Sequence, residues 1–162
     1  MNVRTTFARL ACAATFLLAA LAANAAPAGN VFASPAPVPA GGVTRLYFTF
    51  FDDAGLAFNG GTFSMLYPAG VVNVGGVVFD SCGTTVASPG ASGFSSTNIT
   101  VVPSSSCNIY VDVIASIAGT QTITLPAGSF AASSGVNAAD ITASFVVVAP
   151  ITRQAVIPAT PA

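Results

Sequence analysis

Alternation of apolar and polar residues at every second position is the clearest pattern along this chain. It is strongest over residues 43–51, 107–115 and 141–148. In the second of these segments, the odd positions from Cys107 to Val113 are apolar and the even positions between them are polar. A period of two is typical of a β-strand with one buried face. Each of the three segments is therefore predicted to be a half-buried strand.

Weaker versions of the pattern predict further strands at residues 63–67, 97–102 and 120–125. Residues 71–79 are apolar but interrupted by two glycines, which predicts two short strands. Glycine- and proline-rich turns separate the segments. About seven short strands with frequent turns indicate an all-β protein, a single immunoglobulin-like β-sandwich. The expected core phenylalanines are Phe48, Phe50, Phe63, Phe79 and Phe145.

The two ends of the chain differ from this body. Residues 1–25 have two arginines, a 14-residue apolar run and the small-x-small sequence 23–25, the pattern of a secretory signal peptide cleaved after Ala25. An uncleaved anchor helix and a lipoprotein modified at Cys12 are weaker alternatives. Residues 26–149 form the expected sandwich domain, with 30–40 as an extended edge strand or lead-in. Residues 150–162 are a proline- and alanine-rich tail.

Composition narrows the range of functions. The chain has no histidine, lysine, glutamate or tryptophan, and cleavage after Ala25 leaves five aspartates and two arginines, a net charge of −3. Most proton-transfer and hydrolytic sites use histidine, glutamate or lysine, so we expect neither an enzyme nor a cofactor. No basic stripe is present, so nucleic acid is not an expected partner. No later apolar run reaches membrane length, so no transmembrane segment is expected after cleavage.

Cysteine usage is consistent with export. Of the three cysteines, Cys12 lies in the signal sequence, which leaves Cys82 and Cys107 as an even pair. In an oxidising compartment these two are expected to form a disulfide. Two free, buried thiols are the alternative. A metal site is less favoured, because two isolated cysteines supply only half of a zinc site.

Two short motifs invite a chemical interpretation. Asp52 and Asp53 precede a glycine, so a loop there could offer oxygen ligands to Ca²⁺, although a solvated turn is the favoured reading. Ser81 and Cys82 follow an aspartate, but the chain holds no histidine to act as their base. A structural role is therefore expected for both.

The outward positions of the strands carry the remaining candidate residues. Tyr47 and Tyr110 fall on predicted outward faces, and they would form a small aromatic patch if their strands were neighbours. Exposed aromatic rings are common in sugar-binding sandwiches, so this pair is a candidate ligand patch. Asp112, two residues from Tyr110, is expected to face solvent.

The order of several motifs resembles a bacterial extracellular family of immunoglobulin-like repeats, domain of unknown function eleven and its close relatives. The matching segments span roughly residues 31–149: 32–35, 39–42, 44–50, 66–70, 82–83, 90–96, 107–113 and 137–148. Two departures are Tyr67, inserted into the Leu-Pro-x-Gly corner, and the presence of one copy rather than a tandem array. The resemblance implies an exported sandwich with a spacer or adhesive role and no catalytic residues.

Together these patterns predict a non-catalytic, exported structural or interaction module, acting as a surface or matrix adhesion or scaffold domain. Its partner would be a protein or a cell-surface polymer. The alternative is a soluble module, periplasmic or secreted, that binds a small sugar or peptide. Expected locations are the extracellular space or the cell surface, with the periplasm as the alternative. A pilus subunit is a variant of the first prediction and requires a donor strand of alternating apolar residues at one terminus. Residues 30–40, with three prolines, are a poor donor, and a weak edge or a missing strand in the sandwich would reopen the idea.

Overall fold

The structure, a computed structural model, describes residues 26–150. The predicted signal peptide and almost all of the predicted tail lie outside these residues. The described chain is all β. Its strands are β1 (Pro27–Ser34), β2 (Val38–Pro39), β3 (Gly42–Asp52), β4 (Phe58–Leu66), β5 (Val71–Asp80), β6 (Thr84–Val86), β7 (Gly93–Val101), β8 (Cys107–Ala115), β9 (Gly119–Leu125), β10 (Ala131–Ala132), β11 (Gly135–Val136) and β12 (Ile141–Val148).

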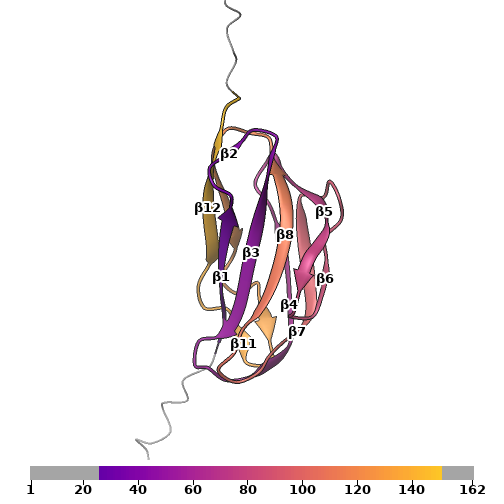
Figure 1. Cartoon of the computed structure of the whole chain (residues 1–162). Helices are drawn as coiled ribbons and strands as arrows, with labels where there is room; N and C mark the ends of the chain where they lie inside the picture. The colour runs from indigo at the N-terminus through magenta and orange to yellow at the C-terminus, as the bar shows by residue number, and fades with distance from the viewer. Residues whose placement is uncertain (1–25, 151–162) are drawn as a thin grey trace, which may run out of the picture.

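The strands form a sandwich of two layers (Figure 1). One layer is a four-stranded sheet in the order β1-β3-β8-β5, in which every neighbouring pair is antiparallel. The other layer contains the sheets β11-β10-β4-β7-β6 and β2-β12-β9. The prediction of an all-β, immunoglobulin-like sandwich is confirmed. The described chain starts at the lower end of the sandwich in Figure 1 and leaves it at the upper end, after β12.

The proline-rich segment near the start of the domain carries the chain from one layer to the other. β1 pairs with β3 along its whole length, whereas β2 pairs in parallel with the end of β12. Pro35 and Pro37 lie between β1 and β2, where proline's missing N–H removes no ladder hydrogen bond. Of the predicted segment 30–40, residues up to Ser34 belong to the edge strand β1, which begins at Pro27, and the rest leads the chain to β2. β1 also lies against β12 of the other layer.

The core lies between the two layers and is rich in phenylalanine. Phe48 and Phe50 of β3 are fully buried, and the Phe48 ring lies 5.1 Å from the Phe94 ring of the opposite layer. The Phe50 ring lies 5.2 Å from that of Phe63 and 4.9 Å from that of Phe130. Burying one such side chain contributes about 1.5–3 kcal/mol. Phe48, Phe50 and Phe63 are buried as predicted, whereas the sequence pattern did not predict Phe94 and Phe130 as core residues.

Residues 71–80 form one irregular strand rather than the two short strands predicted. The pairing of β5 with β8 shifts register between Asn73 and Val77, and again between Val77 and Phe79. The extra residues on β5 break its alternation, so Val77 packs against the core while Phe79 turns outward and is 46% exposed. The prediction that Phe79 belongs to the core was wrong. The prediction of about seven strands also missed β6, β10 and β11, which have only two or three residues each.

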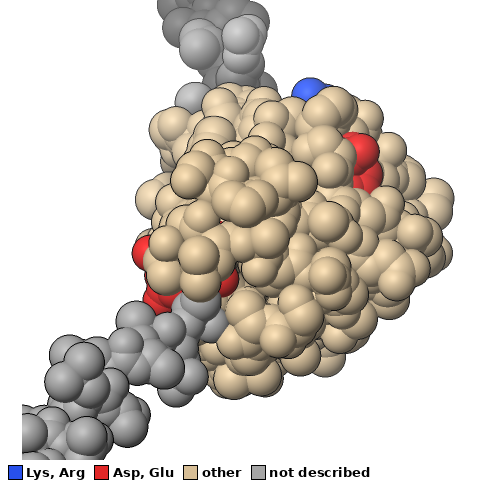
Figure 2. Space-filling view, turned by 90° about the horizontal axis from the view of Figure 1, so that it is seen from below, with Lys and Arg blue, Asp and Glu red and all other residues tan. Residues whose placement is uncertain are grey.

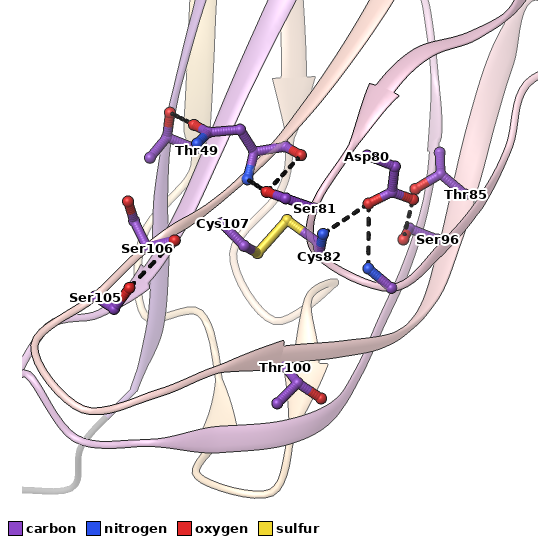
Figure 3. The surroundings of a disulfide bond; sticks show 12 residues. Thr49, Asp80, Ser81, Cys82, Thr85, Ser96, Thr100, Ser105, Ser106 and Cys107 are labelled. Atoms are coloured by element: carbon purple, nitrogen blue, oxygen red, sulfur yellow. Dashed lines mark hydrogen bonds between the residues drawn. A yellow bond between two sulfur atoms is a disulfide. The ribbon is translucent and has the colours of Figure 1, made fainter.

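A disulfide joins the start of β8 to the loop after β5 (Figure 3). The Cα atoms of Cys82 and Cys107 are 4.9 Å apart, and both residues are buried. The Asp80 carboxylate orders this loop, because its Oδ1 atom accepts the N–H groups of Cys82 at 2.8 Å and Gly83 at 3.1 Å. The bridge ties the irregular end of β5 to the central strand β8.

Candidate interaction surface

A row of four aromatic side chains crosses the outer face of the β1-β3-β8-β5 sheet. Tyr47 of β3 pairs directly with Tyr110 of β8, and their ring centroids are 4.7 Å apart. Phe32 of β1 pairs with Tyr47, and Phe79 of β5 pairs with Tyr110. Each strand of the sheet thus supplies one ring to what we call the aromatic row. The two tyrosines that the sequence indicated are neighbours at its centre.

The rings of the aromatic row contact one another closely. Phe32 and Tyr47 are nearly parallel, with an interplanar angle of 4° and a centroid distance of 4.6 Å. Tyr110 stacks on Phe79 at 5.0 Å and meets Tyr47 at a tilt of 58°. Stacked rings cover part of each other's faces, which leaves edges, hydroxyl groups and the two outer rings open to contact. The outer rings are the most exposed, Phe32 at 54% and Phe79 at 46%.

An ion pair borders the aromatic row on one side. The Arg45 guanidinium donates two hydrogen bonds to Asp112, from Nε to Oδ1 at 2.7 Å and from Nη2 to Oδ2 at 3.0 Å. Arg45 and Asp112 are cross-strand partners two residues from the two tyrosines. The hydrogen bond to Asp112 raises the pKa of Arg45 above its already high ordinary value. Asp112 is on the outward face, as predicted, and its charge is paired.

Neutral polar groups border the aromatic row on the other side. Thr49 Oγ1 donates to Asn108 Oδ1 at 2.8 Å, and the Asn108 N–H donates to Ser81 Oγ at 2.9 Å. The backbone N–H of Ser81 returns a bond to the Asn108 carbonyl at 2.9 Å. The surface therefore has an apolar centre between two polar borders, the layout common in protein interfaces.

Sequence reasoning found half of the aromatic row. Phe32 was not predicted to lie on an outward strand face, because the residues around it, just before the proline-rich segment, show no alternation that would mark a strand. Phe79 was assigned to the core because the irregularity of β5 cannot be read from a period of two. Phe32 and Phe79 could have been found only from the pairing of β1 with β3 and of β5 with β8.

The adjacent aspartates at the end of β3 have different environments. Asp52 is only 5% exposed, so the prediction of a solvated turn was wrong for this residue. Its Oδ1 atom accepts the N–H groups of Ala54 at 2.9 Å and Leu56 at 3.1 Å, which fixes the turn from inside. Asp53 is exposed. Within residues 26–150, no group of three or more histidine, cysteine or acidic residues is placed to hold a metal ion.

Asp80, Ser81 and Cys82 each have a structural contact. Asp80 accepts backbone N–H groups, Ser81 bonds to Asn108 of β8, and Cys82 is in the disulfide (Figure 3). The serine hydroxyl therefore faces backbone groups rather than a general base. This arrangement explains the short polar motif without catalysis.

Charge is sparse on the surface. Figure 2 shows a face that is mostly uncharged, with small groups of acidic atoms and a single basic group. Arg45 is the one basic side chain in residues 26–150, and it is paired with Asp112. The described part of the chain therefore offers little charge for long-range electrostatic attraction. Among residues 26–150, there is no helix that is long and apolar enough to cross a membrane.

The chain belongs to the family described as Domain of unknown function (DUF7933), whose pattern matches residues 29–147. The narrower assignment made from the motifs, to domain of unknown function eleven and its relatives, stays a prediction. No curated protein matches the chain.

Two solved structures are similar to this one. A non-cellulosomal cohesin from the hyperthermophilic archaeon Archaeoglobus fulgidus has a TM-score of 0.53 and 14% sequence identity, and the match covers 74% of this chain and 91% of the cohesin. BslA, a bacterial hydrophobin, has a TM-score of 0.48 and 13% identity, with 77% of this chain and 97% of BslA covered. At these identities the likeness to the cohesin establishes the β-sandwich fold.

Proposed function

We propose that this protein is an exported, non-catalytic interaction module, which acts as a surface or matrix adhesion or scaffold domain. The observation that carries the proposal is the aromatic row from Phe32 to Phe79. Contiguous exposed apolar side chains with a polar rim often mark sites where a protein binds another molecule. Tyrosine and phenylalanine are enriched where proteins bind each other.

The geometry of the rings favours a protein partner over a polysaccharide. A sugar ring stacks on the open face of an aromatic side chain. Between Phe32 and Tyr47 the faces are turned toward each other, with 4° between the planes. What remains is an apolar ridge with tyrosine hydroxyls, bordered by the Arg45–Asp112 pair. Such a ridge suits the side chains of another protein, with the polar borders as a hydrogen-bonding rim.

Export is supported by the predicted signal peptide and by the disulfide, because disulfides persist in oxidising compartments. The interaction role is also consistent with the fold, since a cohesin shares the sandwich. A pilus subunit is less favoured. β12 pairs with β9 along its length and with β2 at its end, and it also lies against β1, so its edges already have neighbours.

The proposal is tested by fractionating cells that produce the protein. One variant replaces all four rings of the aromatic row by threonine, which suits a strand: Phe32→Thr, Tyr47→Thr, Phe79→Thr and Tyr110→Thr. The matched control replaces two exposed apolar residues elsewhere, Leu66→Thr and Val86→Thr. We expect wild type and control in the surface or matrix fraction and the four-ring variant in the medium. Equal retention of all three would overturn the proposal.

A second function, binding of a small sugar or peptide, is favoured by one observation. Tyr47 and Tyr110 are adjacent, and the outer faces of Phe32 and Phe79 are open. A titration of the purified protein with mono- and oligosaccharides and with short peptides, followed by tyrosine fluorescence, tests it. Saturable binding that the Tyr47→Thr substitution abolishes, together with recovery as a soluble periplasmic monomer, would select this function instead.

A further inference from the structure

The first described residue is held by the carboxylate of Asp53. The backbone nitrogen of Ala26 donates to Asp53 Oδ1 at 2.9 Å, and the backbone N–H of Asp53 donates to the Ala26 carbonyl at 3.2 Å. These bonds continue the pairing of β1 with β3, which begins at Pro27 opposite Asp52. Ala26 therefore has a defined partner, although it precedes the first strand.

This end of the sandwich is acidic. Ala26, Asp53 and Asp140 line one hollow of about 160 Å³, and the buried carboxylate of Asp52 is next in sequence to Asp53. Arg45, the one basic side chain in the described part of the chain, is occupied by Asp112 on the sheet face. Asp53 is therefore the carboxylate bonded to the Ala26 nitrogen, with Asp140 in the same hollow, and the hollow is lined by no basic side chain from residues 26–150.

We propose that Ala26 is the first residue of the mature protein and that its α-ammonium group forms an ion pair with Asp53. A signal peptidase would add water across the Ala25–Ala26 peptide bond, which releases a carboxylate on Ala25 and an ammonium on Ala26. The amide N–H now bonded to Asp53 is thereby replaced by a charged group with three donors. The proposal rests on the predicted signal peptide and not on the proposed function.

Cleavage at this bond, rather than one residue later, fits the geometry. Removal of Ala26 would delete both of its bonds to Asp53 and would leave Pro27, a buried residue, at the chain end. A charged hydrogen bond is roughly twice as strong as a neutral one. Because the pair is exposed, its contribution to stability is modest, and the ion pair works mainly as an anchor for the start of β1.

The first part of the test is the intact mass of the protein exported by its own cells from the full chain. The mass is expected to correspond to a chain that starts at Ala26 with a free amine. A mature chain that starts at Pro27, that retains Ala25 or that is not cleaved would overturn the proposal.

The second part measures the ion pair on the mature protein. The chain contains no lysine, so an amine-specific acetylating reagent has a single amine to modify, the α-amine. Acetylation removes the charge, and in low salt at pH 7 it is expected to lower the Tm of wild type by about 1–4 °C. In Asp53→Asn the same acetylation should change the Tm by much less. Because Asp53 is exposed, this variant is expected to fold.

Asp140→Asn is the matched control, since it removes a negative charge from the same hollow and leaves Asp53 in place. It should retain the effect of acetylation. An equal effect of acetylation in wild type and Asp53→Asn would overturn the ion pair. Loss of the effect in Asp140→Asn as well as in Asp53→Asn would also overturn it, because a general field rather than a specific partner would then act on the amine.

Discussion

The phenolic hydroxyl of Tyr67 donates a hydrogen bond to Oδ1 of Asn73 at 2.7 Å, and both side chains are buried. The Asn73 amide nitrogen donates to the carbonyls of Gly93 at 2.8 Å and Ser88 at 3.2 Å. One buried asparagine thus joins the corner after β4 to the loop before β7. Tyr67 is the residue inserted into the Leu-Pro-x-Gly corner that the motif resemblance implies, and this contact gives it a structural role there.

Tyr67 should make the protein sensitive to alkali. Burial raises the pKa of Tyr67, so the native state keeps this proton at pH values where the unfolded chain has lost it. Its contribution to the free energy of unfolding is complete below about pH 10 and falls as the pH rises further, by up to about 1.4 kcal/mol per unit.

Urea unfolding between pH 9 and 11.5 measures this slope. Tyr67→Phe is the matched variant, because it keeps the ring and removes the titrating group. It should lose about 1–3 kcal/mol at pH 7 from the unpaired Asn73 oxygen, and its stability should then fall less steeply with pH. Parallel slopes for wild type and variant would contradict the role given to Tyr67.

Gly93, at the start of β7, is expected not to tolerate a side chain. A Cβ atom there would collide with the backbone carbonyl oxygen of Met65 in the neighbouring strand. Gly93→Ala should therefore destabilise the protein by about 1–3 kcal/mol or more. Gly75→Ala is the control, since a Cβ atom at Gly75 meets no atom within 4 Å. If thermal unfolding showed equal losses for both variants, the close approach of β7 to β4 would be wrong.

Substitutions of Phe48 and Phe79 compare the inner and the outer face of the β1-β3-β8-β5 sheet. Phe48→Ala removes a fully buried ring and should cost about 3–5 kcal/mol, whereas Phe79→Ala should cost about 1 kcal/mol or less. Chemical denaturation measures both values. A loss at Phe79 as large as that at Phe48 would restore the sequence-based view that Phe79 belongs to the core.

The disulfide should contribute substantially to stability. It closes a loop of 25 residues, which corresponds to about 3.5 kcal/mol in the chain-entropy estimate. The double variant Cys82→Ala, Cys107→Ala should lose roughly this amount and should become insensitive to reductant, while wild type unfolds more easily in its presence. Stability of wild type that is unchanged on reduction would count against the bridge.

The strands with regular alternation were predicted well from sequence because a half-buried strand forces a period of two. β3, β8 and β12 start and end within a residue of the predicted segments, and the outward positions of Tyr47 and Tyr110 follow from the same rule. Short strands such as β6 and β10 left no periodic signal. Whether these two or three residues form a strand depends on the strands they pair with rather than on their own sequence.

The candidate surface could be predicted only in part, since it depends on which strands pair. Phe32 and Phe79 join the tyrosines through the order β1-β3-β8-β5, a long-range property of the fold. The buried polar residues were also missed. Asn137, for example, accepts the N–H of Phe130 and donates to the carbonyls of Pro126 and Ala139, which organises the loop before β12. An asparagine in a loop sequence gives no sign that it will be buried.

The central claim, that the aromatic row is a binding surface, is tested most directly by hydroxyl-radical footprinting. Oxidation rates of Phe32, Tyr47, Phe79 and Tyr110 would be compared between the purified protein and the protein on the cells that export it. Leu66 and Val86, which are exposed on other strands, serve as internal references. We predict oxidation of the four rings several-fold slower on cells, with the references unchanged. Equal oxidation of the rings in both states would contradict the claim.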